Sequence, residues 1–282
     1  MRERKTEVRN LLKLSQGEVI TRSRNHLIVC EDLNALYEKF AKDIADIIIR
    51  NNNDDKKTKL ILPVGPTGQY PKLAEIINRK KLSLENCWFF FMDEYCDFDG
   101  KALGKEHPLS FKKSAEEKFF NLLSQEIKFN KKQVIFPNEK NIDGLADLIR
   151  KHGGIDACFG GIGIHGHVAF NEPNPKVKDS NPRKVRLNNY TVTINAIRAE
   201  VGGNLETFPR EAFTLGMKQI LDAKKIRLYC RNGTTFDWAN TVLRIALLGK
   251  PNYDYPVTYI RNHLDYIITT DKDTLKSPKN VI

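Results

Sequence analysis

The sequence lacks the features of a membrane or exported protein. No apolar run approaches the roughly 20 residues that a membrane-spanning helix needs. The first ten residues, MRERKTEVRN, are charged, and no apolar segment follows them closely, so no secretory signal is indicated. We therefore expect a soluble, cytoplasmic protein with no membrane partner.

Cysteine is scarce and irregularly placed. The 282 residues include five cysteines, namely Cys30, Cys87, Cys96, Cys158 and Cys230. An odd number of widely separated cysteines, most of them inside apolar segments, indicates neither a disulfide framework nor a zinc site. We expect reduced thiols in or near the core, and no metal site.

Nucleic-acid-binding signatures are also missing. The formal net charge of +11 favours anionic partners through the summed field of the protein. The basic residues are spread along the chain, however, without zinc-finger spacing, an RNA-binding signature or a basic stripe interleaved with aromatic residues. We therefore expect a small phosphorylated molecule as the partner, and no nucleic acid.

The features that are present alternate along the chain. Short apolar segments predict strands at 26–30, 59–65, 87–92, 133–137, 155–161, 190–194, 225–230 and 265–270. A long amphipathic helix is predicted from Asp32, where apolar residues recur at helical spacing, and another helix near 236–248. The alternation predicts an α/β fold: a mainly parallel, doubly wound, Rossmann-like sheet with helices on both faces. We expect one domain over residues 1–282, with residues 1–25 as an N-terminal extension.

Three loops that follow predicted strands have unusual compositions, and ligands bind beyond the carboxyl ends of such strands. The first, GPTGQYP, contains Gly65, Pro66, Thr67 and Gly68. It precedes a helix, so its backbone N–H groups and the Thr67 hydroxyl could surround an anion. A tight turn is the alternative, because the loop lacks the lysine and the spacing of a nucleotide P-loop.

The second loop places two carboxylates, Asp93 and Glu94, directly after the apolar strand CWFFFM. Such a pair can cap a helix or lie in solvent, but a partly desolvated carboxylate can act as a general base.

The third loop, FGGIGIHGHVAFNEP, combines glycines with two histidines. Gly161, Gly163 and Gly166 allow a ligand to approach the backbone closely, and His167 can move a proton near neutral pH. Glu172 follows five residues later and could orient His167 or stabilise its charge if the loop folds back. A lone histidine beside glycines is more often structural, but three unusual loops together favour a site.

These motifs resemble those of the glucosamine-6-phosphate deaminase family, which is related to 6-phosphogluconolactonases. LPVGPTGQYP, MDEY followed by KEHPLSF, and GGIGIHGHVAFNEP occur here in the order of that family, with a similar layout from about His26 to Thr270. The GHVAFNEP segment is the most specific of them. The lactonases typically lack FNEP and carry an arginine at the position of Tyr95, so the deaminase branch is the closer match.

The resemblance implies a function and roles for individual residues. The family converts glucosamine 6-phosphate to fructose 6-phosphate and ammonia without a metal or organic cofactor. Asp93 matches its base for proton transfer between C1 and C2, and His167 matches its ring-opening residue, with Glu172 as partner. The positions that match its substrate- and phosphate-binding residues are Gly65, Pro66, Thr67, Gly68, Gly161, Gly163, Gly166 and Arg198. The resemblance also favours a homo-oligomer.

The chain departs from the family pattern at three places. His165 stands where the family has an aspartate of its catalytic group, so we expect weaker support for a charged His167 and slower or pH-shifted ring opening. The phosphate-binding lysine should fall near Gly233 to Asp237, where this chain has none. An insertion, Asp97 to Gly104, follows the proposed base.

These departures leave two further interpretations open beside the deaminase. One is an isomerase of another sugar phosphate that releases no ammonia, and the other is a non-catalytic regulator that binds a sugar phosphate. Lys184 and Arg186 also match, loosely, positions that some family members use for an allosteric phosphate.

Overall fold

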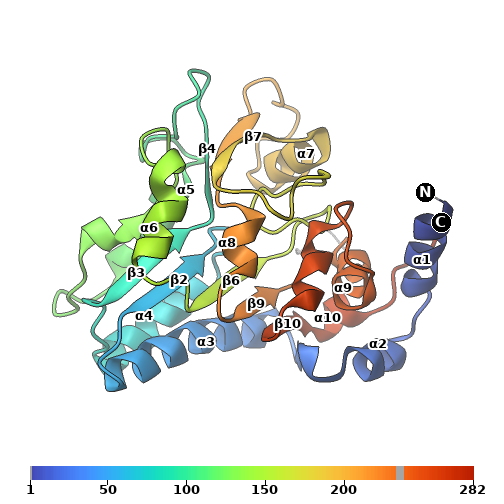
Figure 1. The fold of residues 1–282 in the computed structure, drawn as a ribbon, viewed down its shortest axis with the longest axis horizontal. Helices are drawn as coiled ribbons and strands as arrows, with labels where there is room; N and C mark the ends of the chain where they lie inside the picture. Colours follow the sequence, from blue (N-terminus) through green and yellow to red (C-terminus); the bar gives the residue numbers. More distant parts are fainter. Residues whose placement is uncertain (1, 233–237) are drawn as a thin grey trace.

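A parallel sheet of seven strands forms the centre of the computed structural model, which describes residues 2–232 and 238–282 (Figure 1). Its strand order is β1-β10-β9-β6-β2-β3-β5, and every neighbouring pair is parallel. The strands are β1 (Leu27–Cys30), β2 (Thr58–Leu62), β3 (Cys87–Phe91), β5 (Val134–Ile135), β6 (Ala157–Gly161), β9 (Ile226–Tyr229) and β10 (Tyr266–Asp271). The predicted mainly parallel sheet is thereby confirmed.

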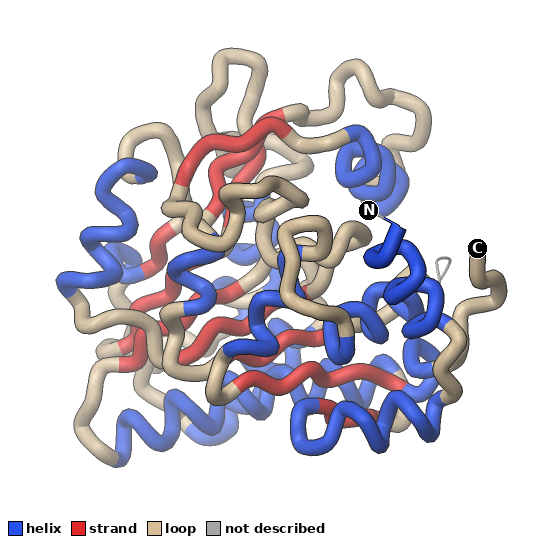
Figure 2. Tube along the Cα trace, turned by 45° about the vertical axis from the view of Figure 1, so that its right-hand side comes forward, coloured by secondary structure: helices blue, strands red, loops and turns tan. Residues whose placement is uncertain are grey.

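Helices cover both faces of this sheet, as the doubly wound prediction required (Figure 2). Leu60 and Leu62 of β2 pack into one core with α3 (Leu33–Asn53), α4 (Gln69–Lys80) and α5 (Phe111–Lys118). Ile61, between them, faces the other core with α6 (Leu145–Lys151), α8 (Met217–Leu221) and α9 (Ala239–Leu248). Successive side chains of a strand point to opposite faces, so a strand buried on both faces is apolar throughout.

The predicted long helix begins where the sequence indicates. The side chain of Asp32 accepts a hydrogen bond from the backbone N–H of Ala35 (2.8 Å) and so caps α3. The apolar positions Leu36, Phe40 and Ile44 are completely buried.

Residues 2–25 pack against the end of the chain. They contain α1 (Arg2–Leu12) and α2 (Gln16–Ser23), and Val19 is fully buried in the core that α9 also lines. The buried guanidinium of Arg244 donates to the carbonyl oxygens of Leu14 (3.2 Å) and Leu275 (3.1 Å). This one side chain therefore joins the N-terminal segment to α10 (Lys272–Leu275), near the C-terminus.

A second, antiparallel sheet lies above the carboxyl edge of the first, at the top of Figure 1. Its strands are β4 (Asp93–Tyr95), β8 (Glu211–Thr214) and β7 (Arg183–Arg186). A small apolar cluster that includes Tyr95, Phe170, Val192 and Phe208 packs this sheet against α7 (Asn189–Arg198).

The prediction of a strand at 190–194 is wrong, because this segment forms the first half of α7. Alternating β-branched residues favour a strand. Here the Asn188 side chain accepts a hydrogen bond from the backbone N–H of Thr191 (3.0 Å) and caps a helix instead. Thr191, Val192 and Ala196 are buried on one side of that helix, so tertiary packing decides the outcome.

The remaining helices are single turns of 3₁₀ helix at Arg24–His26, Phe120–Leu122, Lys131–Gln133 and Ile142–Gly144, and a longer one at Pro256–Asn262. Within the described residues no helix is both long enough and apolar enough to span a bilayer. All five cysteines are free, and all but Cys30 are buried, as expected from the sequence.

Candidate active site

The candidate residues gather where the direction of the sheet reverses. After β2 the chain proceeds through β3 and β5 to one edge, then returns to β6 on the other side of β2 and continues outward through β9 and β10. The loops after β2 and β6 therefore diverge from adjacent strands. A crevice at such a switch point is the usual ligand position in an open α/β sheet.

The two glycine-rich loops touch at this point. A methyl group added at Gly161 would lie 2.9 Å from Cδ of Pro66 and 3.0 Å from the carbonyl oxygen of Gly65, so only glycine allows this approach. The Gly65–Pro66 peptide bond is cis. The side chain of Gln69 donates to the carbonyl oxygen of Pro66 (2.8 Å), which fixes the loop at the start of α4.

Gly166 differs from the expectation that a ligand approaches its backbone. It is buried, and a methyl group added to it would lie 3.2 Å from both Cδ1 of Tyr255 and Cγ1 of Val257. Its N–H donates to the carbonyl oxygen of Gly163 (2.8 Å), and its own carbonyl oxygen accepts from the N–H of Val257 (2.7 Å). With a φ of +64°, Gly166 makes the turn that leads to His167. The protein itself thus binds both backbone polar groups of Gly166, and its substrate-binding role stays a prediction.

Asp93 lies at the carboxyl end of the next strand, β3, where β4 begins. Its side chain is 7% exposed, and burial together with the neighbouring charge of Glu94 raises the pKa of its carboxyl group to about 8. A carboxylate that binds its proton this tightly has the basicity that general-base catalysis near neutral pH requires.

Glu94 has a different environment, that of a structural cap. Its carboxylate accepts hydrogen bonds from the backbone N–H groups of Tyr95 (3.0 Å), Phe111 (3.0 Å) and Lys112 (2.9 Å), and from the Ser110 hydroxyl (3.2 Å). Burial raises its pKa to about 7, although these hydrogen bonds act in the opposite direction. Glu94 therefore satisfies the first amides of α5, which is the capping alternative for this pair.

His167 is held against the backbone of its own loop. A methyl group added at Gly163 would overlap its Nε2 atom, so the imidazole occupies the space that a side chain at 163 would need. The ring is 9% exposed, and burial, with smaller contributions from His165 and Arg198, lowers the pKa of His167 to about 3. It is therefore neutral at physiological pH, and one of its ring nitrogens carries a lone pair.

Gly163→Ala should displace this imidazole and lower kcat/KM by about a hundredfold, because a 1 Å shift of a catalytic group costs roughly that much. Gly17→Ala is the matched control, since a methyl group there meets nothing within 4 Å. Steady-state kinetics on both variants, with circular dichroism for folding, tests this. Equal activity of a folded Gly163→Ala protein would remove His167 from the mechanism.

Asn188 forms hydrogen bonds with both His165 and Glu172, the two candidate residues beside His167. The backbone N–H of Asn188 donates to Oε2 of Glu172 (2.9 Å), and its side-chain amide reaches Nδ1 of His165 (2.8 Å). One nitrogen of each histidine and one oxygen of Glu172 lie within 4.8 Å of one another. The structure thus brings the three residues together, but Glu172 bonds to the start of α7 and not directly to His167.

Arg198 connects these residues to the first loop. Its charge lowers the pKa of His167 and also acts on Tyr37, whose ring fills the space that a Cβ atom on Gly68 would need. Desolvation by neighbouring protein atoms and the charge of Arg231 lower the pKa of Arg198 itself, although the residue as a whole is exposed. Within the described residues Arg198 forms no ion pair with a carboxylate, so an anion placed here would meet an uncompensated cation.

Two further cations near this loop were missed from the sequence. Arg231 follows β9, its guanidinium lies 5.4 Å from the centre of the Tyr37 ring, and its buried Nε atom has no partner within the described residues. Lys118, at the end of α5, donates to the Thr67 hydroxyl (3.1 Å). Arg231 could have been found as a basic residue directly after a predicted strand, whereas nothing local singles out Lys118. The segment Gly233 to Asp237, where the family places its phosphate-binding lysine and this chain has none, lies outside the described residues.

The insertion at 97–104 extends the small sheet. Cys96 and Ala102 form an antiparallel bridge, and the side chain of Phe98 is 84% exposed. Lys184, the loose match to an allosteric position, is paired with Glu211 (3.0 Å).

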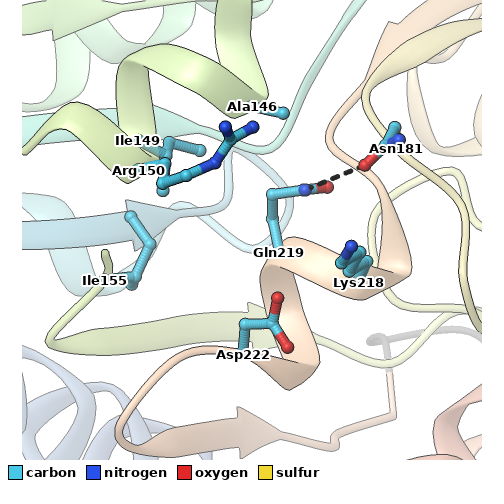
Figure 3. A pocket seen from close by; sticks show the side chains of 8 residues that line it. All are labelled: Ala146, Ile149, Arg150, Ile155, Asn181, Lys218, Gln219 and Asp222. Atoms are coloured by element: carbon cyan, nitrogen blue, oxygen red, sulfur yellow. Dashed lines mark hydrogen bonds between the residues drawn. The ribbon is translucent and has the colours of Figure 1, made fainter. Parts of the chain in front are cut away.

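A separate pocket of about 270 Å³ lies between α6 and α8, and none of the candidate residues lines it (Figure 3). Within its lining, the side-chain amide of Gln219 donates a hydrogen bond to the side-chain oxygen of Asn181, and Arg150 and Asp222 line the same pocket. Ile155 also lines it and precedes β6, so the pocket lies toward the amino ends of the strands, away from the switch point.

The parallel sheet with its switch-point loops is shared with solved structures of the superfamily to which glucosamine-6-phosphate deaminase belongs. A solved 6-phosphogluconolactonase from Thermotoga maritima shares the fold, with a TM-score of 0.65 over 87% of this chain and 99% of its own, at 17% identity. A solved monomeric glucosamine-6-phosphate deaminase has a TM-score of 0.75 and 25% identity over 88% of this chain and 98% of its own. No protein-family model matches the chain.

Sequence comparison identifies the branch within this class. The glucosamine-6-phosphate deaminase of Thermoanaerobacter sp. (strain X514) is 30% identical over 245 residues, which are 84% of this chain and 90% of that protein. The chain belongs to the glucosamine-6-phosphate deaminase family.

Proposed function

We propose that the protein converts glucosamine 6-phosphate and water to fructose 6-phosphate and ammonia. The observation that carries the proposal is the position of Arg198, whose charge acts both on His167 and on the residues around the first glycine loop. A phosphate between Arg198 and this loop would place the sugar of the same molecule toward the proton-transfer residues. Binding energy from the phosphate then positions the reacting carbons.

The two proton-transfer groups suit the two steps that the reaction needs. Neutral His167 accepts the proton of the C1 hydroxyl and returns one to the ring oxygen, which opens the sugar ring. Asp93, as a carboxylate, then takes the C2 proton, because the C1 aldehyde carbonyl of the open-chain sugar acidifies that C–H bond. It delivers the proton to C1 of the enolamine so formed, which becomes the C2 iminium. Water adds to the resulting C2 iminium, and ammonia leaves as the ketone forms.

Glu172 supports these steps by its position. Burial raises the pKa of its carboxyl group, while the hydrogen bond from the backbone N–H of Asn188 opposes that effect. A carboxyl group within 4.8 Å of both imidazoles can stabilise positive charge as His167 takes up a proton.

A panel assay tests the proposal directly. The purified protein is incubated with glucosamine, mannosamine, glucose and fructose 6-phosphates, and ammonia and ketose are measured separately. We expect equimolar ammonia and fructose 6-phosphate from glucosamine 6-phosphate, and neither product after boiling. Ketose without ammonia would identify an isomerase, and ligand binding without any product would identify a non-catalytic binding protein.

A further inference from the structure

His165, His167 and Glu172 form a compact donor set in the loop that follows β6. Their nearest ligand atoms lie within 4.8 Å of one another, and the two imidazole rings meet edge to face with centroids 6.2 Å apart. The ring centroids of two imidazoles bound to one tetrahedral zinc ion lie about 5 Å apart, since Zn–N bonds are about 2.0–2.1 Å long. Both rings are thus near the separation that a shared ion would impose.

Two atoms of this set are buried without a partner within the described residues. They are Nδ1 of His167, a side chain that is only 9% exposed, and Oε1 of Glu172. Leaving a buried polar atom unsatisfied costs about 1–3 kcal/mol, so such atoms usually have a bound species to contact. Here one unpartnered atom is a nitrogen and the other a carboxylate oxygen, and a cation satisfies both.

We propose that these three side chains bind one divalent transition-metal ion, of which zinc is the reference case. Two imidazoles and one carboxylate are ligands that zinc accepts, with the fourth position left for water or substrate. In a tetrahedral site the ligand atoms lie about 3.3 Å apart, so small side-chain rotations complete the geometry. The family resemblance implied no metal, and His165 is the reason for the difference, because it supplies a second imidazole in place of a carboxylate.

The hydrogen bond from Asn188 indicates which nitrogen of His165 carries the lone pair that a metal ion would use. The side-chain amide of Asn188 donates to Nδ1 of His165 (2.8 Å), while its oxygen is held by the N–H of Thr191 (3.0 Å). The lone pair of His165 therefore lies on Nδ1. A metal ion there replaces a single hydrogen bond between neutral groups, which contributes only about 1 kcal/mol.

The metal and the transferred proton compete for His167. A neutral imidazole has one lone pair, and once that pair is bound to a metal, the ring cannot accept the proton of the sugar hydroxyl. The site therefore makes turnover sensitive to metal if the proposed function holds. Metal binding itself does not depend on that function.

Calorimetric titration of chelator-treated, dialysed protein with Zn²⁺ alone tests the site, and the visible spectrum of bound Co²⁺ reports its ligands. We expect one ion per chain and a nitrogen–oxygen spectrum without thiolate bands. His165→Gln and Glu172→Gln should each weaken binding at least tenfold, because even outer-shell partners of a metal contribute about 10- to 100-fold. His152→Gln is the matched control, since this histidine stacks on Trp88, outside the three-residue cluster.

No Zn²⁺ binding below millimolar concentration, or binding unchanged in folded His165→Gln and Glu172→Gln proteins, would overturn the proposal. If either variant fails to fold by circular dichroism, His165→Asn replaces it. Where the protein turns over glucosamine 6-phosphate, added Zn²⁺ should also slow the reaction and a chelator should restore it. A protein that binds Zn²⁺ at these residues but deaminates no sugar refutes the proposed function and leaves the metal site standing.

Discussion

Replacing Asp93 with asparagine should lower kcat about a hundredfold to ten-thousandfold while leaving sugar-phosphate binding largely intact. The amide keeps the shape of the carboxylate but cannot accept a proton, and a positioned acid–base group typically contributes that much. Steady-state kinetics gives kcat, and calorimetry with the substrate gives affinity. A variant that retains a tenth or more of wild-type kcat would show that another group moves the proton.

The same substitution should stabilise the protein at high pH. Folding raises the pKa of Asp93 from its usual value of 3.8 to about 8, so between these values the folded chain holds a proton that the unfolded chain releases. The contribution of Asp93 to the free energy of unfolding therefore falls as pH rises from about 4 to 8. Asparagine does not titrate, so the free energy of unfolding of the variant, measured with urea, should rise relative to that of wild type between pH 5 and pH 9.

Glu94→Gln is the control that separates the two adjacent carboxylates. Its amide nitrogen would face backbone N–H donors at the start of α5, and such a mismatch costs about 1–3 kcal/mol of stability. We expect a lower free energy of unfolding but a smaller loss of kcat than in Asp93→Asn. A larger kcat loss in a folded Glu94→Gln protein would show that Glu94 is the base.

The central sheet could be predicted because its signal is local. Strands buried on both faces read as short apolar runs, and six of the predicted segments are strands of the parallel sheet, with the short β5 as a seventh. The small antiparallel sheet could not be read in this way. Its strand β7 is the charged sequence Arg183–Arg186, which no apolar run marks as a strand. It forms by pairing with β8, the central strand of this sheet, whose other edge pairs with β4.

The candidate site was predictable where chemistry and a strand end coincide in the sequence, as at Asp93 and His167. The separate roles of Asp93 and Glu94 were not, because they depend on the amides of Phe111 and Lys112, which are distant in the sequence. Likewise, the charge of Arg231, which follows β9, acts on Arg198 at the end of α7, an element distant from β9 in the sequence. Contacts of this kind depend on strand order, which no local pattern records.

Gly166 shows the same limit for a residue that the sequence did single out. A glycine in a loop indicates an unusual backbone conformation or a close approach, but not which of the two. Here the φ of +64° accounts for the glycine, and the segment around Tyr255 and Val257, about 90 residues further along the chain, fills the space beside it. That packing could not be read from the loop itself.

Phosphorylated sugars should bind at least a hundredfold more tightly than their unphosphorylated counterparts, and two arginines should account for most of the difference. Desolvation and repulsion from the nearby charge of Arg231 lower the pKa of Arg198. A phosphate between them removes that repulsion and accepts charge-assisted hydrogen bonds of about 1.5–3 kcal/mol each. Since 1.4 kcal/mol is a tenfold change in affinity, each arginine should contribute about ten- to a hundredfold.

Calorimetry on Arg198→Ala, Arg231→Ala and the double variant, with glucosamine and its 6-phosphate as ligands, measures these contributions. Each single variant should weaken binding of the phosphorylated sugar and leave binding of the other unchanged, so that selectivity falls. Arg150→Ala is the control, because Arg150 pairs with Asp147 on exposed α6 surface, away from the crevice. The two losses should not add in the double variant, because removing one arginine also removes the repulsion on the other. Unchanged selectivity in Arg231→Ala alone would leave Arg198 and the loop amides as the phosphate site. Unchanged selectivity in both single variants would show that the phosphate binds elsewhere.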